Sequence, residues 1–316
     1  MRFIKMQGAG NDYVYVDGFT EQVENPADVA RKISNRRFGV GSDGLILIRP
    51  PSSPGADCRM EMYNADGSRG QMCGNGIRCV AKYVYEQSIA PGEEIRIETD
   101  AGLKTLHVRT HFRTSENGTS PNGKRGKVHR VEVNMGPPLL ARSAIPFEDG
   151  GDPHAPAIDV KMSAAGRSFR VTALSMGNPH VVTRWEGGAS GSAASLSEDA
   201  SLSEEEAPRL DDLPLSEWGP HFENHPWLPK RTNTEFITFS SRREMNLRVW
   251  ERGSGETLAC GTGACAAVVA GVLNGWCERE VTVHLRGGDL EIRWAEGDDG
   301  DVFLTGPAVE VFRGDW

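Results

Sequence analysis

Two short glycine-rich stretches, "MCGNGIRCV" at 72–80 and "ACGTGACAA" at 259–267, contain the same Cys-Gly-x-Gly pattern 187 residues apart. Each runs directly into an apolar segment with helical spacing. Glycines beside a thiol remove side-chain bulk and let backbone N–H groups approach a ligand closely. The helix that follows directs its first N–H groups and its positive dipole end at the same point. The pattern therefore predicts two equivalent loops, each suited to activating a thiol or binding a carboxylate.

Strand-like runs with alternating apolar and polar residues dominate the rest of the chain. They lie at 13–16, 45–48, 94–99, 128–134, 168–174, 180–183, 235–239, 246–250, 281–285, 290–294 and 302–304. Glycines 287 and 288, between two of these runs, predict a hairpin turn. Helices are expected after Asn25, with Gly39 as the stop, and over 77–87 and 264–273. Residues 264–273 are small and apolar all round, which indicates a buried helix. Many strands with few buried helices are typical of an α+β fold.

The same order of elements occurs twice: a run of strands, then Cys-Gly-x-Gly, then a helix. We expect an N-terminal half over 1–134 carrying Cys73 and a C-terminal half over 135–306 carrying Cys260, with "VNMGPP" at 133–138 between them. Two inserts of biased composition interrupt the halves. The first, 110–127, is interpreted as a long hairpin loop, and the second, the acidic stretch 187–206, as disordered.

Composition narrows the class of protein. The 316 residues carry a net charge of −9 with a pI of about 5.5, which disfavours a nucleic-acid partner. No run approaches the roughly 18 apolar residues of a membrane helix, and the start of the chain lacks a signal-peptide pattern. We therefore expect a cytoplasmic protein without a membrane partner. The six cysteines are then expected to be free thiols.

Three kinds of thiol chemistry compete at the two loops. A structural disulfide is disfavoured in the cytoplasm, and zinc usually needs a shorter Cys-x₂₋₄-Cys spacing with further ligands, so no metal is expected. Cys58, Cys79, Cys265 and Cys277 are interpreted as packing residues. Acid–base chemistry remains. If the two halves face each other, a thiolate on one side and a thiol on the other can invert a stereocentre between them. The helix N-termini would stabilise the carbanion without a cofactor.

The chain closely resembles the diaminopimelate epimerase family. The matching stretches are "KMQGAGNDYVYVD" (5–17), "YNADGSRGQMCGNGIRCVAKY" (63–83), "GNPHVV" (177–182), "RTNTEFI" (231–237) and "ERGSGETLACGTGACAA" (251–267). The resemblance implies two pseudo-symmetric halves, each a mostly antiparallel, barrel-like sheet around a central helix. It also implies that the last strand, 307–316, returns to the first half. The implied activity is the cofactor-independent interconversion of LL- and meso-diaminopimelate, a step toward lysine and peptidoglycan.

The resemblance also assigns roles to individual residues. It implies that Cys73 and Cys260 are the acid/base thiols and that His180 and Glu251 assist proton movement beside them. Substrate contacts are implied for Asn11, Asn64, Gly74, Asn75, Asn178, Asn233, Arg252, Gly261 and Thr262. From its residue type, Arg252 is suited to grip a distal carboxylate. Taken alone, each Asn would be a turn residue, and His180 or Glu251 an ordinary structural or solvated group.

Some alternatives stay open. A racemase of the same fold acting on proline or hydroxyproline is the second reading, and Asn75 and Arg252 argue against it. A non-enzymatic redox switch joining Cys73 to Cys260 is the third. Gly44 stands where some relatives carry a glutamine that reaches the site, so that contact is in doubt here. The sequence leaves open whether the protein is a monomer or a homodimer.

Overall fold

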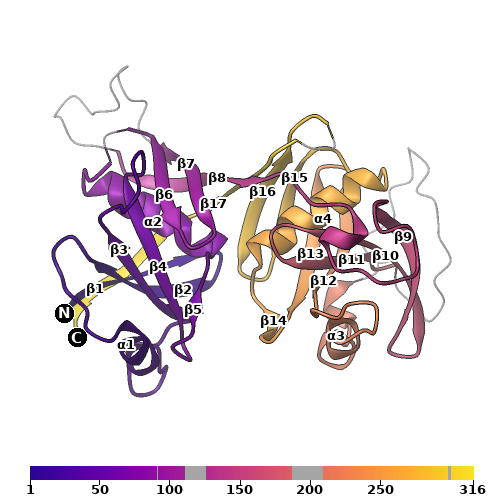
Figure 1. Cartoon of the computed structure of the whole chain (residues 1–316), viewed down its shortest axis with the longest axis horizontal. Helices are drawn as coiled ribbons and strands as arrows, with labels where there is room; N and C mark the ends of the chain where they lie inside the picture. The colour runs from indigo at the N-terminus through magenta and orange to yellow at the C-terminus, as the bar shows by residue number, and fades with distance from the viewer. Residues whose placement is uncertain (91, 111–125, 187–208, 298–299) are drawn as a thin grey trace. The chain divides into compact units, whose positions relative to one another are not determined.

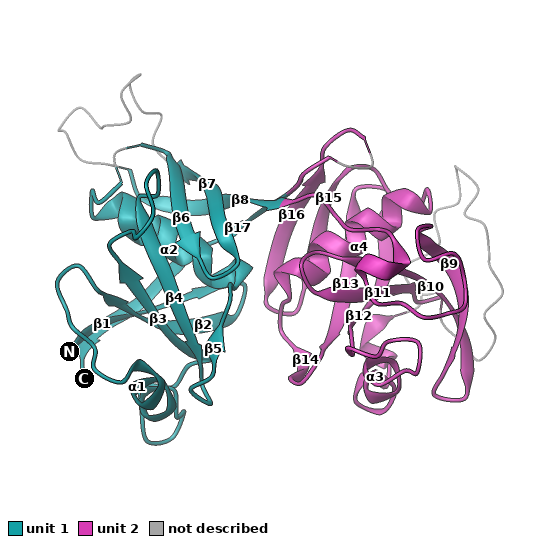
Figure 2. Ribbon diagram, in the orientation of Figure 1, with its two compact units in different colours: residues 1–135, 303–316 teal, residues 136–302 magenta. Residues whose placement is uncertain are grey.

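The computed structural model describes residues 1–90, 92–110, 126–186, 209–297 and 300–316. All of the acidic insert 187–206, and 111–125 of the first insert, lie outside these residues, so both interpretations stay predictions. The chain forms two compact units (Figure 2). Unit 1 contains Met1–Met135 and Phe303–Trp316, and unit 2 contains Gly136–Val302.

Unit 1 is built on a mixed, mostly antiparallel sheet (Figure 1). Its strands are β1 (Arg2–Gly8), β2 (Asn11–Asp17), β3 (Gly44–Arg49), β4 (Cys58–Asn64), β5 (Arg69–Gly70), β6 (Glu94–Thr99), β7 (Gly102–Thr110), β8 (Val128–Gly136), β17 (Val302–Pro307) and β18 (Val309–Asp315). They pair in the order β18-β1-β2-β3-β4-β6-β7-β8, with β5 on β4 and β17 on β8. The β2–β3 and β4–β6 pairs are parallel.

Helix α2 (Gly74–Glu86) forms the centre of unit 1. It packs against β1, β2, β4, β6 and β7, and its residues 75–85 are all buried. The helix begins three residues earlier than the sequence predicts, because Gly74, Asn75 and Gly76 have weak helix propensity but lie directly after a capping residue.

The other helix of unit 1, α1 (Pro26–Ile33), lies between β2 and β3 in the chain and packs on β3 and β4. The predicted stop at Gly39 is wrong, because α1 ends at Ile33. A Cβ at Gly39 would lie 2.4 Å from the Lys32 carbonyl oxygen, so this glycine permits a close approach of two backbone segments. Asn25 has a left-handed backbone (φ 50°) and makes no side-chain cap bond.

Unit 2 has a second sheet of the same kind. Its strands are β9 (Ala157–Ala164), β10 (Arg167–Ser175), β11 (Pro179–Arg184), β12 (Asn233–Ser241), β13 (Glu244–Glu251), β14 (Gly255–Thr257), β15 (Glu280–Leu285) and β16 (Gly288–Trp294). They pair in the order β9-β10-β11-β12-β13-β15-β16, with β14 on β13, and β11–β12 and β13–β15 are parallel. Because Leu285 pairs with Gly288, the hairpin turn is centred on Arg286 and Gly287.

Two helices accompany this sheet. The buried helix α4 (Gly261–Leu273) packs against β10, β11, β12, β13 and β16. Helix α3 (Leu215–Glu223), which the sequence analysis did not predict, follows a short 3₁₀ turn at Leu210–Asp212. Its Gly219 and Pro220 resemble turn residues in the sequence. A Cβ at Gly219 would lie 2.2 Å from the Trp250 ring, so the glycine lets α3 pack closely on that indole.

The two units share one topology. Strands β1 to β7 correspond in order, pairing and direction to β10 to β16, and helices α1 and α2 correspond to α3 and α4. The predicted α+β class with two similar, mostly antiparallel halves is confirmed. The cores are apolar, and edge-to-face contacts among Phe169, Trp218, Phe222 and Phe236 stabilise that of unit 2. None of the described helices is long and apolar enough to cross a membrane.

Candidate active site

The two Cys-Gly-x-Gly cysteines occupy the same structural position, the N-cap of a 13-residue helix. Cys73 (φ −131°, ψ 118°) precedes α2, and its Sγ accepts the Gly76 N–H at 3.4 Å. Cys260 (φ −123°, ψ 113°) precedes α4, and its Sγ accepts the Gly263 N–H at 3.3 Å. An extended N-cap residue whose side chain accepts from the third helical N–H is the usual capping arrangement. Both sulfur atoms therefore lie at the positive end of a helix dipole.

The last glycine of each motif sets how closely the helix packs on the sheet. A Cβ at Gly76 would lie 2.8 Å from Ile46 Cδ1, and one at Gly263 would lie 2.6 Å from Glu235 Oε1. Ile46 and Glu235 are equivalent residues of the equivalent strands β3 and β12. Each glycine thus lets the cysteine of its own motif lie over the equivalent point of its own sheet.

In unit 1 the partly buried Cys73 faces the start of β2. Its thiol donates to Asn11 Oδ1 at 3.1 Å, and Asn11 Nδ2 donates to Asp43 Oδ2 at 2.7 Å. Burial, with the nearby sulfur of Cys73, raises the pKa of the Tyr13 phenol well above its usual range, so Tyr13 stays protonated. Asn64, at the end of β4, donates to Ser68 Oγ at 2.9 Å.

Asn75 belongs to a buried cluster around an arginine that the sequence analysis did not predict. Arg78 is fully buried, and its Nη1 donates to Asn75 Oδ1 at 3.0 Å and to the Gly74 carbonyl at 3.1 Å. Its Nε donates to the Pro307 carbonyl at 3.1 Å. Burial lowers the pKa of Arg78. Arg78 thus fixes the first turn of α2 to the end of β17. A charged residue within an apolar helical run, "GIRCV", was the available signal.

In unit 2, Cys260 is almost completely buried and has acid/base groups around it. Its Sγ lies 3.4 Å from Thr262 Oγ1, and the Glu251 carboxyl is near enough to the thiol to influence its pKa. Burial, followed by the negative charges of Glu251 and Glu235, raises the pKa of Cys260 well above its usual value. Burial also raises the pKa of Glu251, against hydrogen bonds from Thr257 and Cys260 that lower it. The Glu251 carboxyl therefore lies near a thiol whose raised pKa favours the protonated form.

A second chain of hydrogen bonds extends from Cys260 through Thr262. Thr262 Oγ1 accepts from Asn178 Nδ2 at 3.3 Å, and Asn178 Oδ1 lies 3.0 Å from His180 Nε2. His180 Nδ1 lies 2.7 Å from Glu235 Oε1, and both side chains are fully buried. His180 thus joins the buried carboxyl of Glu235 to the Asn178 amide. Glu235 was not predicted, because within the strand-like run "TEFITF" a single Glu is indistinguishable from a solvent-facing residue.

Asn233, the first residue of β12, is hydrogen-bonded to Arg252, which directly follows β13. Asn233 Oδ1 accepts the Arg252 N–H at 2.9 Å, and its Nδ2 donates to the Pro179 carbonyl at 3.4 Å. Arg252 is exposed, and its Nη1 donates to the Lys230 carbonyl at 3.1 Å. A guanidinium has five N–H donors, so this bond leaves others to grip a carboxylate.

Gly44 has no space for a side chain. A Cβ there would lie 2.1 Å from the Tyr63 carbonyl oxygen and 2.8 Å from the Tyr13 ring. The substrate contact that a glutamine provides in some relatives is therefore absent at this position of β3.

The structure brings the predicted residues together in two groups, one in each unit. Unit 1 holds Asn11, Asn64, Cys73, Gly74 and Asn75, and unit 2 holds Asn178, His180, Asn233, Glu251, Arg252, Cys260, Gly261 and Thr262. The other four cysteines are buried free thiols: Cys58, Cys79, Cys265 and Cys277. In the described part of the chain, no three His, Cys, Asp or Glu side chains gather as metal ligands would.

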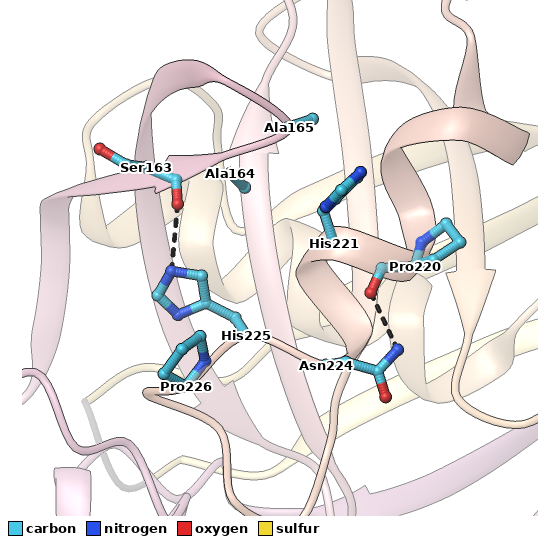
Figure 3. Close-up of a pocket in the computed structure, with 8 residues that line it drawn as sticks. All are labelled: Ser163, Ala164, Ala165, Pro220, His221, Asn224, His225 and Pro226. Carbon is cyan, nitrogen blue, oxygen red and sulfur yellow. Dashed lines mark hydrogen bonds between the residues drawn. The ribbon is translucent and has the colours of Figure 1, made fainter.

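A hollow of about 360 Å³ in unit 2 lies apart from these residues (Figure 3). It is lined by Ser163, Ala164, Ala165, Pro220, His221, Asn224, His225 and Pro226. Both ring nitrogens of His225 are in use, since Nε2 contacts the Ser163 carbonyl at 3.1 Å and Nδ1 accepts the Trp227 N–H at 3.2 Å. His225 therefore offers no free ring nitrogen to this hollow.

Comparisons with known proteins agree on one family. The sequence model described as "Diaminopimelate epimerase" matches residues 3–138 and 204–311. The "Diaminopimelate epimerase" of Desulfovibrio desulfuricans is 47% identical across all of this chain and 98% of its own. That of Methanococcus maripaludis is 44% identical across all of this chain and 99% of its own.

More distant solved structures show the same fold. A phenazine biosynthesis protein of the PhzF family from Bacillus anthracis has a TM-score of 0.63 at 16% identity, covering 99% of this chain and 98% of that one. A hydroxyproline epimerase from Agrobacterium vitis has a TM-score of 0.60 at 14% identity, covering 99% and 91%. At these identities the likeness concerns the fold alone.

Proposed function

The chain belongs to the diaminopimelate epimerase family, a family of isomerases, and we propose that it interconverts LL- and meso-diaminopimelate with Cys73 and Cys260 as paired acid and base. The observation that carries this proposal is the equivalence of the two thiols. Each caps a central helix, and each accepts an N–H from a glycine of the same motif. Inversion of a carbon needs an acid and a base of similar kind on opposite faces, because the roles exchange when the reaction runs backward.

The proposed reaction is a proton exchange at the α-carbon. One sulfur, as thiolate, takes the Cα proton, so a C–H bond breaks and an S–H bond forms. The other thiol gives its proton to the opposite face, so an S–H bond breaks and a C–H bond forms. The electron pair released in between is delocalised into the adjacent carboxylate. This mechanism requires both sulfur atoms to reach the same carbon.

Stabilising the carbanion is the difficult part of such a reaction. The substrate α-carboxylate would accept from the N–H groups at the starts of α2 and α4, where Gly74, Asn75, Gly261 and Thr262 lie. Preorganised N–H donors stabilise charge that develops in the transition state. These donors belong to the chain itself, so the proposed step requires no cofactor.

Glu251 and His180 are proposed to move protons at the Cys260 side. Glu251 lies near the Cys260 thiol and raises its pKa by its charge, so it is placed to take the thiol proton when substrate binds. His180 connects to the same region through Asn178 and Thr262. Beyond the reacting centre, Asn11, Asn64, Asn178 and Asn233 are proposed to contact substrate polar groups. Arg252 is proposed to bind the distal carboxylate bidentately.

The proposal is tested with purified Cys73→Ala and Cys260→Ala variants. Each should lower the rate of epimerisation by at least about 10²–10⁴-fold, the usual contribution of a general acid or base. Retention of full activity by either folded variant would overturn the two-thiol assignment. A parallel assay with proline, hydroxyproline and the two diaminopimelate isomers tests the substrate, with activity expected for diaminopimelate. The proposed step would serve the synthesis of lysine and peptidoglycan.

A further inference from the structure

A carboxylate behind the Cys73 site fixes the direction of the Asn11 amide. Asp43 Oδ2 accepts from Asn11 Nδ2 at 2.7 Å and from the Asp12 N–H at 3.0 Å, and Asp43 Oδ1 accepts from Arg36 Nη2 at 2.8 Å. Burial raises the pKa of Asp43, whereas the three donors and the Arg36 charge oppose that shift and favour the ionised form, which only accepts hydrogen bonds. Asn11 must therefore turn its NH₂ toward Asp43 and its carbonyl oxygen toward Cys73.

The direction of this amide bears on the protonation of the thiol. Asn11 Oδ1 lies 3.1 Å from Cys73 Sγ, where it accepts an S–H bond. A thiolate has no hydrogen to donate and would place a negative sulfur against a carbonyl oxygen. We propose that Asp43 is a positioning residue that holds the Asn11 amide so that Cys73 rests as the protonated thiol. The consequence for catalysis rests on the epimerase function proposed above. Under that function, a protonated Cys73 is the proton donor in the free enzyme.

The other groups that face Cys73 act in both directions. Tyr13 and Tyr15 of β2, and Arg78 and Cys79 of α2, are the titratable neighbours on the packed elements. The Gly76 N–H, the Arg78 charge and the protonated Tyr13 phenol favour a thiolate, whereas the Asn11 carbonyl favours a thiol. The amide is the component that can reverse, because rotation by about 180° exchanges its donor for its acceptor. The ionised Asp43 prevents that rotation.

The experiment replaces Asp43 with an amide in the full chain. In Asp43→Asn the new side chain can donate to Asn11 Oδ1, so the Asn11 NH₂ can turn to Cys73 and stabilise a thiolate. The pH dependence of alkylation by iodoacetamide is followed for the Cys73 peptide by mass spectrometry. The midpoint is expected to fall by about one pH unit relative to wild type, equivalent to about tenfold faster alkylation below the midpoint.

Asp12→Asn is the matched control. It also removes a carboxylate beside Arg36, but the Asp12 side chain bonds to Lys5 and Arg36 and leaves the Asn11–Asp43 bond intact. A smaller shift than in Asp43→Asn supports the proposal. An unchanged midpoint in Asp43→Asn, or an equal shift in both variants, would show that the amide is not locked by Asp43.

A second measurement needs no change at Asp43. The infrared S–H stretching band of wild type at neutral pH is compared with that of Cys73→Ala. The proposal predicts a hydrogen-bonded S–H band that the variant lacks, and its absence would overturn the resting thiol. Neither readout involves substrate. An inactive protein with the expected shift would therefore refute the epimerase function while leaving the role of Asp43 intact.

Discussion

Helices α2 and α4 begin in the same way, yet the chemistry around their capping cysteines differs. The residue beneath Gly76 is the apolar Ile46, whereas the residue beneath Gly263 is the buried acid Glu235. Tyr13 pairs with the first residue of β3, and at the equivalent place in unit 2 His180 pairs with the first residue of β12. A repeated backbone thus supports two different sets of side chains.

The difference indicates how the two thiols divide the work. Cys260 has the Glu251 carboxyl nearby, and His180 is connected to it through Thr262 and Asn178. The proposed function needs a group to take the proton of this sulfur. Cys73 faces an amide and a phenol that keeps its proton. The repeat provides two equivalent positions for sulfur, and only the position in unit 2 has carboxyl groups close to it. Four changes test this comparison.

The largest effect is expected for Glu251→Gln, which removes the proposed proton acceptor of Cys260. The turnover number should fall by about 10²–10⁴-fold, in the range of a lost general base. The control is Glu256→Gln, on the neighbouring strand β14, whose side chain pairs with Arg248 and Arg286 instead. Equal losses in both variants would mean that Glu251 has no special relation to Cys260.

Ile46→Glu places in unit 1 the acid that unit 2 carries at the equivalent position. In unit 1 the equivalent of His180 is Tyr13, so the new carboxylate would be buried without the imidazole partner that Glu235 has. The free energy of unfolding should fall by about 3–5 kcal/mol, the effect of an uncompensated buried charge. Urea unfolding monitored by circular dichroism measures it. A decrease in the free energy of unfolding of less than 1 kcal/mol would show that positions 46 and 235 are less alike than their packing indicates.

The two motif glycines offer a matched pair of alanine variants. In Gly263→Ala the new methyl meets the carboxyl oxygen of Glu235, which its bond to His180 holds in place, whereas in Gly76→Ala it meets the terminal methyl of Ile46. Overpacking should cost about 1–3 kcal/mol, with Gly263→Ala at the upper end because Ile46 can change rotamer. Thermal unfolding of both variants tests this order, and the reverse order would contradict it.

The smallest expected effect concerns the pH at which Cys260 reacts. Burial and the charges of Glu251 and Glu235 raise its pKa, so wild-type Cys260 should be alkylated only at pH values above the usual range for a thiol. Removing one negative neighbour lowers that pKa. In Glu251→Gln the midpoint of the pH dependence of Cys260 alkylation should therefore move to lower pH by about one unit. Peptide mass spectrometry follows Cys260 separately from Cys73. A midpoint that rises would contradict the proposed electrostatics.

Part of this architecture could be predicted from the sequence. The eleven expected strand runs all fall within observed strands, because alternating residues mark half-buried strands clearly. Six of the described strands were missed, namely β1, β4, β5, β7, β9 and β14. In β1, Lys5 is buried in an ion pair with Asp12, and in β4 the buried positions are Cys58, Met60 and Met62, none of them β-branched. Propensity carries no information about such tertiary partners.

The candidate site shows a similar limit. The two cysteines could be found because glycine, sulfur and a helix start leave a local pattern twice. Asp43, Arg78 and Glu235 leave no such pattern, since each matters through a contact with a residue at least 3 and up to 229 positions away. Arg78 and Glu235 matter because they are buried, and Asp43 because of its hydrogen bonds, and the sequence specifies neither for a single charged residue.

The two-thiol account is tested most directly by exchange of the Cα hydrogen in deuterium oxide, starting separately from LL- and meso-diaminopimelate. With wild type, the product stereoisomer should gain deuterium from its first formation, while the remaining substrate gains it more slowly, because different thiols remove and deliver the proton. Cys73→Ala and Cys260→Ala should lose product labelling, and each should impair exchange from a different stereoisomer. Product that keeps the substrate's own hydrogen in early turnovers would point to a single base and contradict the account.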